Sequence, residues 1–169
     1  MLKWVTLSLF LAVGALLPTQ SFAAIDEVLL EMDGLYCPFC SAPTERRVRK
    51  AMDASSSEQW LEDGIIRFEI APNTAFRPEA GIKKLEESSF KYVSMTVKAT
   101  GKLSAASGGT VLEVPENDIS FKLEDSDDIT LKAKNFMDSA TGKTVTIIGK
   151  YYPNPQNPKL PILKVEQAS

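Results

Sequence analysis

The order of strand-like and helix-like segments between residues 25 and 103 most constrains how this chain can fold. Apolar residues recur there alternately at strand spacing and at helical spacing. The dipeptide Asp63-Gly64, which favours a hairpin turn, divides one of these segments into two strands. The expected elements are a strand at 25–32, a helix at 42–52, two strands within 58–70, a helix at 76–88 and a strand at 91–103. This order predicts the split βαβ arrangement of a ferredoxin-like domain.

After residue 97 the helical signals fade and short strand candidates follow, separated by turn residues. The candidates are 108–114, 118–124, 129–134, 143–152 and 160–166, with a short helix at 135–140. Strands of this length and spacing predict a small all-β barrel of the oligonucleotide/oligosaccharide-binding (OB) type. The predicted fold class is therefore α+β, with a ferredoxin-like βαββαβ domain at 25–96 and an OB-like barrel at 97–169. The strand at 91–103 can serve both parts, so the boundary is approximate.

Residues 1–23 have the pattern of a secretory signal peptide. Lys3 precedes an apolar run from Trp4 to Leu17, and small residues end the segment before Ala24. The run is shorter than the ~20 residues of a membrane-spanning helix, so we expect cleavage rather than stable membrane insertion. The mature protein is then expected to be soluble, exported and periplasmic.

The chain contains no histidine, which is the most restrictive fact in its composition. Histidine is the usual zinc partner and general base, so every Ser/His or Cys/His catalytic arrangement is excluded. The net charge is −3, and both signs are mixed along the chain, which gives no support to nucleic-acid binding. We therefore expect a binding protein rather than an enzyme.

Cys37 and Cys40 are the two cysteines of the chain and its candidate functional residues. Such a pair can bind a soft metal ion, exchange electrons as a dithiol and disulfide, or close a small structural loop. The loop is too short to constrain the unfolded chain much, so reactive chemistry is favoured over a structural role. Two thiolates without imidazole suit Cu(I) or Hg(II) better than Zn(II), which prefers four ligands.

The cysteine loop GLYCPFC, residues 34–40, resembles the Gly-Met-x-Cys-x-x-Cys loop of heavy-metal-associated (HMA) domains. The expected element order over residues 26–96 is similar to that family as well. HMA domains include copper chaperones, metal-binding modules of P-type ATPases and a periplasmic mercury-scavenging protein. The resemblance implies that Cys37 and Cys40 bind the metal ion directly. It also implies exchange of the ion with a donor or acceptor protein, such as a membrane metal transporter.

Some positions after the cysteines depart from this family pattern, and others extend it. Pro43 lies three residues after Cys40, and a proline deep in a helix removes a hydrogen bond and clashes with the preceding turn. We therefore expect the helix to begin after the cysteines, with Ser41 as its N-cap. Phe90 and Lys91 stand where family members carry a residue that leans over the metal, although Phe90 is equally well explained as core.

Thiol–disulfide exchange is the alternative function. The motif YCPFC also looks like the active site of glutaredoxin-type and periplasmic disulfide oxidoreductases. Those folds need a cis-proline that faces the dithiol, and neither Pro72, after a strand, nor Pro78, at a helix start, fits that position. The sequence thus predicts an exported carrier of a soft metal ion, with a periplasmic thiol–disulfide oxidoreductase as the second interpretation.

Overall fold

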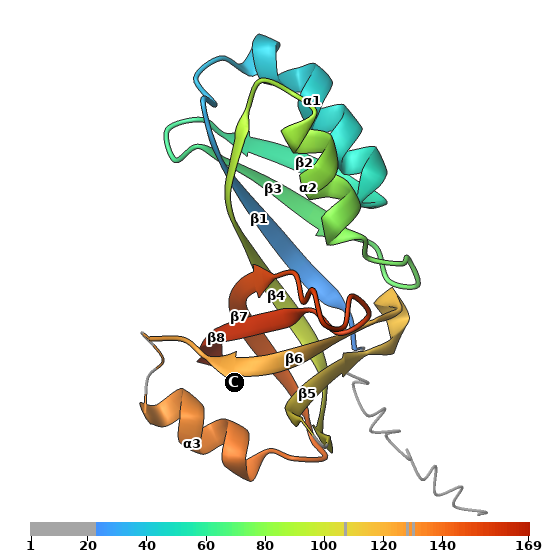
Figure 1. Ribbon diagram of the computed structural model, residues 1–169, viewed down its shortest axis with the longest axis vertical. Helices are drawn as coiled ribbons and strands as arrows, with labels where there is room; N and C mark the ends of the chain where they lie inside the picture. The colour runs from blue at the N-terminus through green and yellow to red at the C-terminus, as the bar shows by residue number, and fades with distance from the viewer. Residues whose placement is uncertain (1–22, 107, 128, 130) are drawn as a thin grey trace, which may run out of the picture.

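A computed structural model describes residues 23–106, 108–127, 129 and 131–169 of the chain (Figure 1). The predicted signal peptide, residues 1–23, lies outside this part except for its last residue. The elements in chain order are β1 (Ile25–Asp33), α1 (Pro38–Ala51), β2 (Ala54–Trp60), β3 (Ile65–Ile70), α2 (Pro78–Glu86), β4 (Lys91–Ala106), β5 (Gly109–Val114), η1 (Pro115–Asn117), β6 (Ile119–Asp125), α3 (Leu131–Ser139), β7 (Thr144–Tyr152) and β8 (Ile162–Ala168). In these ranges no helix has the length and apolarity that crossing a membrane would require.

The described strands form one mixed sheet of eight strands, in the order β2-β3-β1-β4-β5-β6-β8-β7. Neighbouring strands are antiparallel except for the parallel pair β6 and β8. A further antiparallel pairing joins β7 to β4, so that β4, β5, β6, β8 and β7 close into a ring. β1, β3 and β2 continue the sheet from β4, at the end of the molecule that carries α1 and α2 (Figure 1).

The prediction of a ferredoxin-like domain followed by a separate OB-like barrel is wrong, because β4 belongs to both parts of one continuous sheet. β4 is 16 residues long. β1 pairs with its residues 91–99, β7 with 96–102 and β5 with 102–106. The predicted boundary between residues 96 and 97 thus falls inside a strand that is hydrogen-bonded along both edges. The domain limits as such, 25–96 and 97–169, stay a prediction.

Gly101 allows close packing where β4 passes from its pairing with β1 to its pairing with β5. A Cβ atom at this position would lie 2.5 Å from the backbone oxygen of Glu113 and 3.0 Å from Cγ of Leu112. Neither the neighbouring backbone nor a side chain branched at Cγ can give way easily, so glycine is required by the space available.

α1 and α2 lie together on one face of the strands β1, β2 and β3 (Figure 1). Val48 of α1 and Met52, the C-cap of that helix, are buried, and so are Ile82 and Leu85 of α2. A Cβ atom on Gly81 would overlap the Met52 side chain, so this glycine lets the two helices approach closely. The apolar spacing of both helices is thus used to cover the sheet.

The predicted strand at 129–134 is wrong, because α3 begins at Leu131 and runs to Ser139. Ala133, Met137 and Ala140 are buried and recur at helical spacing. This helical period runs through the segment and outweighs the shorter polar–apolar alternation of its first residues. Four of the predicted strands of this half correspond to β5, β6, β7 and β8.

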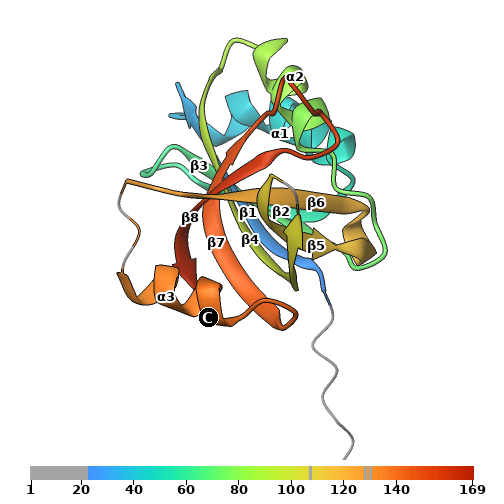
Figure 2. The same cartoon turned by 60° about the horizontal axis from the view of Figure 1, so that its bottom comes forward.

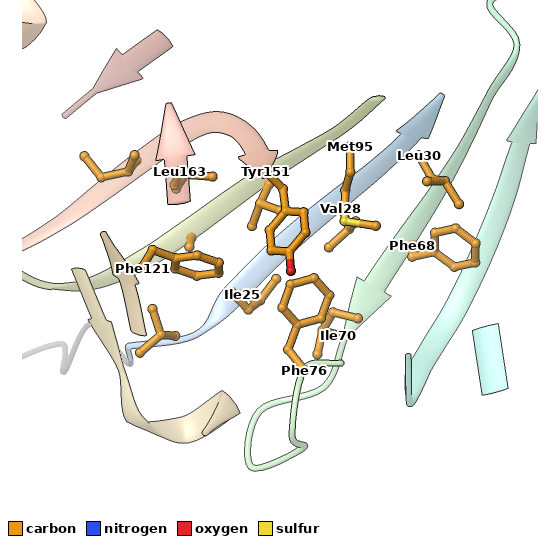
Figure 3. Packing of buried hydrophobic residues seen from close by; sticks show 14 of the residues in the cluster. Ile25, Val28, Leu30, Phe68, Ile70, Phe76, Met95, Phe121, Tyr151 and Leu163 are labelled. Atoms are coloured by element: carbon orange, nitrogen blue, oxygen red, sulfur yellow. The ribbon is translucent and has the colours of Figure 1, made fainter. Parts of the chain in front are cut away.

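The buried side chains form a cluster that continues across the junction between the two ends of the sheet. Tyr151 lies at this junction, with Phe121 and Leu163 on one side of it and Val28 and Met95 on the other (Figure 3). Figure 2 shows β4 and β7 side by side below the helical end of the molecule, where the two strands pair antiparallel. The two ends of the sheet therefore share hydrophobic packing as well as a strand.

Asn117 connects three segments at this junction. Its fully buried side chain accepts a hydrogen bond from the backbone N–H of Ile25 at 2.6 Å. It donates to the carbonyl oxygens of Ala71 at 3.2 Å and Thr74 at 2.8 Å. Alanine would leave the buried N–H of Ile25 unsatisfied. We predict that Asn117→Ala lowers the free energy of unfolding by about 1–3 kcal/mol, measured by chemical denaturation.

Asn135 provides the matched control for this substitution, because it is exposed on α3. Asn135→Ala should change the free energy of unfolding by less than about 0.5 kcal/mol. Equal effects of the two substitutions would show that Asn117 contributes no more than a surface residue.

Candidate functional site

Cys37 and Cys40 form a disulfide at the start of α1, with their Cα atoms 5.3 Å apart. Cys37 is the N-cap of the helix, and the backbone N–H of Cys40 donates to Sγ of Cys37 at 3.3 Å. The start of α1 lies at the end of the molecule far from α3 (Figure 1). The structure thus brings the two predicted site residues together at a helix N-terminus.

The expectation that α1 begins after the cysteines is wrong, since the helix begins at Pro38 and contains Pro43. Pro38 suits the first helical position, where its fixed φ fits and a backbone N–H would have no helical partner. Pro43 removes one hydrogen bond, the one to the carbonyl of Phe39, and Phe39 is 89% exposed, so water can solvate this turn. Ser41, expected as the N-cap, is buried inside the helix.

A polar network below the disulfide fixes the first turns of α1 to β2. The hydroxyl of Ser41 donates to Oε1 of Gln59 at 2.7 Å, and Nε2 of Gln59 donates to the Glu45 carboxylate. The hydroxyl of Ser57 donates to the other oxygen of Glu45 at 2.5 Å. These hydrogen bonds restrict the movement of the turn that carries Cys37 and Cys40 relative to β2.

Sequence reasoning missed this network, although its spacing could have revealed it. Ser41 and Glu45 are four residues apart and therefore share a helix face. Ser57 and Gln59 are two residues apart and therefore share a face of β2. The spacing identifies each face separately, but it does not show that the helix face packs against the strand face.

Two aromatic rings beside the disulfide are exposed to solvent. Tyr36 is 83% exposed and Phe39 is 89% exposed. Cys40 is also exposed, whereas Cys37 is half-buried. Large exposed rings of this kind are typical of surfaces that contact another molecule. The sequence contained both residues inside the motif, but their exposure could not be read from the pattern.

Phe90 and Lys91, which the resemblance to HMA domains was expected to place over a metal ion, lie next to the loop that carries the cysteines. A Cβ atom on Gly34 would come 3.5 Å from the Phe90 ring, and Phe90 also packs against the core. Lys91 is exposed and pairs with Asp33 between β4 and β1. Phe90 therefore supports this loop and belongs partly to the core.

The reduced pair would supply two sulfur donors. Met32, Met52 and Met95 also carry sulfur, but each is at most 3% exposed and fills the core. Within the described ranges, no three Cys, Asp or Glu side chains gather in a way that could hold a metal ion. The arrangement can therefore bind an ion of low coordination number or exchange its disulfide with another thiol.

A hollow of about 760 Å³ lies away from the cysteines, between the start of α2, the turn after η1 and the connection from β7 to β8. The Tyr151 hydroxyl, on its wall, donates to Oε1 of Glu79 at 3.2 Å. Burial, with Glu79 beside it, raises the pKa of Tyr151 far above its usual range. Arg77 and Lys159 line the hollow together with Glu79 and Asp118, so its charge favours neither anions nor cations.

Tyr92 in β4 gives the protein a testable sensitivity to alkali. Burial, and then the neighbouring Tyr152 and Glu86, raise the pKa of Tyr92 to about 12. An unfolded tyrosine has a pKa of about 10, so the stabilising contribution of Tyr92 is complete below pH ~10 and is lost as the pH rises through about 12.

We therefore predict that Tyr92→Phe reduces the loss of thermal stability between pH ~10 and ~12, measured as the melting temperature at a series of pH values. At neutral pH the variant should remain close to the wild type. If the melting temperature of the variant falls as steeply as that of the wild type, ionisation of Tyr92 is not a cause of the fall.

Comparison with known proteins found no matching family model, no matching curated protein and no matching solved structure. The resemblance of the cysteine loop to HMA domains therefore stays a prediction, and the interpretation below depends on the geometry of this chain.

Proposed function

We propose that this protein captures a soft metal ion, Cu(I) or Hg(II), between Cys37 and Cys40 and passes it to another protein. The observation that carries the proposal is the position of both sulfur atoms together at the start of α1, held by the network of Ser41, Gln59 and Glu45. The chain has no other cysteine and no histidine, so it offers a two-sulfur donor set. Such a set suits soft ions that accept two ligands better than Zn(II).

Capture must follow reduction of the disulfide. Two electrons and two protons convert the disulfide to two thiols, and the ion then binds as the thiols lose their protons. The N-terminal end of a helix favours negative charge, so α1 would stabilise the thiolates that the ion needs. The binding-competent form is therefore the reduced protein.

Transfer to a partner requires that incoming ligands reach the ion. Cys40 is exposed, and Tyr36 and Phe39 offer apolar surface beside it. A partner with thiols of its own could dock there and take the ion by ligand exchange. A membrane metal transporter fits this role, and the protein would act as a periplasmic carrier rather than as an enzyme.

The test is a titration of the reduced protein with Hg(II) or Cu(I), followed by the thiolate-to-metal charge-transfer absorption. The absorption should rise to an end point at one equivalent and should be absent from a Cys37→Ser/Cys40→Ser variant. Met95→Leu, which removes a buried sulfur, should retain the end point. A titration curve that is the same for the wild type and the double-serine variant would contradict the proposal.

Thiol–disulfide exchange is a second candidate function, and the observation in its favour is the disulfide itself. A protein with this function would accelerate the reduction of a protein disulfide by glutathione, and the double-serine variant would not. Acceleration together with failure to bind metal would favour this function over metal carriage.

A further inference from the structure

We propose that a thiol reductant opens the Cys37–Cys40 disulfide at one sulfur only, by attack on Sγ of Cys40, and that this step switches on the metal site. The consequence for metal binding rests on the proposed function. The direction of the attack depends only on the geometry at the start of α1.

Access favours Cys40 as the sulfur that is attacked. A thiolate must approach the attacked sulfur on the side opposite the bond that breaks, so that side has to be open. Cys40 is exposed, and its neighbour Phe39 is 89% exposed, whereas Cys37 is half-buried where β1 leads into α1. An incoming thiol therefore meets Cys40 first.

The leaving group favours the same direction. When Cys40 is attacked, negative charge develops on Sγ of Cys37. That sulfur already accepts the backbone N–H of Cys40 at 3.3 Å, and Cys37 is the N-cap of α1. A helix N-terminus stabilises negative charge, and a stabilised thiolate leaves faster. Attack on Cys37 would instead expel Cys40, for whose sulfur the structure describes no corresponding N–H donor.

The step balances with a thiol as the co-reactant. The reductant thiolate forms a bond to Sγ of Cys40, the Cys37–Cys40 bond breaks, and its electron pair leaves on Cys37. A second reductant thiolate then attacks the reductant sulfur of the mixed disulfide and expels the Cys40 thiolate. Two reductant thiols are oxidised to one disulfide, and the protein gains two thiolates or, after protonation, two thiols.

The reductant is thus a substrate of this site and belongs to the class of thiols, either a small molecule such as glutathione or a protein. The oxidised protein has no free thiolate for a metal ion, because both sulfurs are bonded to one another. Thiol supply would then control metal capture through attack at Cys40.

The experiment treats the oxidised full protein with reduced glutathione and stops the reaction at short times with excess N-ethylmaleimide. Fragmentation of the peptide that contains both cysteines shows which sulfur carries glutathione and which carries maleimide, because Pro38 and Phe39 separate them. We expect glutathione on Cys40 over Cys37 by at least ~10 to one. Equal labelling, or glutathione mainly on Cys37, would overturn the inference.

The same reaction in concentrated guanidinium is the control, because unfolding removes the helix and exposes both sulfurs. The ratio should then fall toward one, and a ratio that is unchanged would show that the fold does not direct the attack. The two proposals fail separately. Attack at Cys40 in a protein that holds no Cu(I) would refute metal carriage alone, whereas attack at Cys37 in a protein that binds Cu(I) would refute this inference alone.

Discussion

Phe68→Ala and Phe121→Ala are each expected to lower the free energy of unfolding by about 3–5 kcal/mol, which is the usual cost of emptying a buried phenylalanine site. Both side chains have no exposed surface. Phe68 is in β3 and Phe121 is in β6, so they lie toward opposite ends of the sheet. Because β4 and the hydrophobic cluster connect these ends, we expect each substitution to shift one common unfolding transition.

Phe39→Ala is the matched control, since it makes the same change at a side chain that is 89% exposed. It should alter stability by no more than about 0.5 kcal/mol. The measurement is denaturant unfolding followed by circular dichroism and by tryptophan fluorescence. Two separate transitions, each moved by only one of the two core substitutions, would contradict a shared core.

The sequence allowed most elements to be predicted, because apolar spacing is a local property. Ile82 and Leu85, three residues apart, lie on the buried face of α2, and Asp63-Gly64 marked the turn between β2 and β3, where Gly64 has a φ of +68°. What could not be predicted was how the strands join. Whether β4 ends one domain or belongs to both ends of one sheet depends on its pairing with β7, which is far away in sequence.

The cysteine pair could be found from its spacing, but the conformation around it could not. Pro43 indicated a late helix start, because a proline inside a helix costs a hydrogen bond. Pro38 at the first helical position, the exposed turn at Phe39 and the buried Ser41 together favour the earlier start. Local rules conflict here, and tertiary contacts of α1 with β2 decide between them.

The largest effect on function is expected at the cysteines themselves. Cys37→Ser or Cys40→Ser would each leave one thiolate and a hydroxyl, and a hydroxyl is a poor ligand for a soft ion. We predict that each single substitution lowers the affinity for Cu(I) by about a thousandfold or more, roughly 4 kcal/mol at 1.4 kcal/mol per tenfold. Each variant should be about as stable as the reduced wild type, because Cys40 is exposed and Cys37 is half-buried. Substitutions at such positions usually change the free energy of unfolding only slightly.

The most direct test of metal carriage is a competition for Cu(I) between the protein and a chromophoric chelator, under an inert atmosphere. The reduced wild type should take one equivalent from the chelator, whereas the oxidised wild type and both single-serine variants should take none at the same concentrations. If the reduced wild type competes no better than its oxidised form or the serine variants, Cys37 and Cys40 do not form a metal site and the proposed function is wrong.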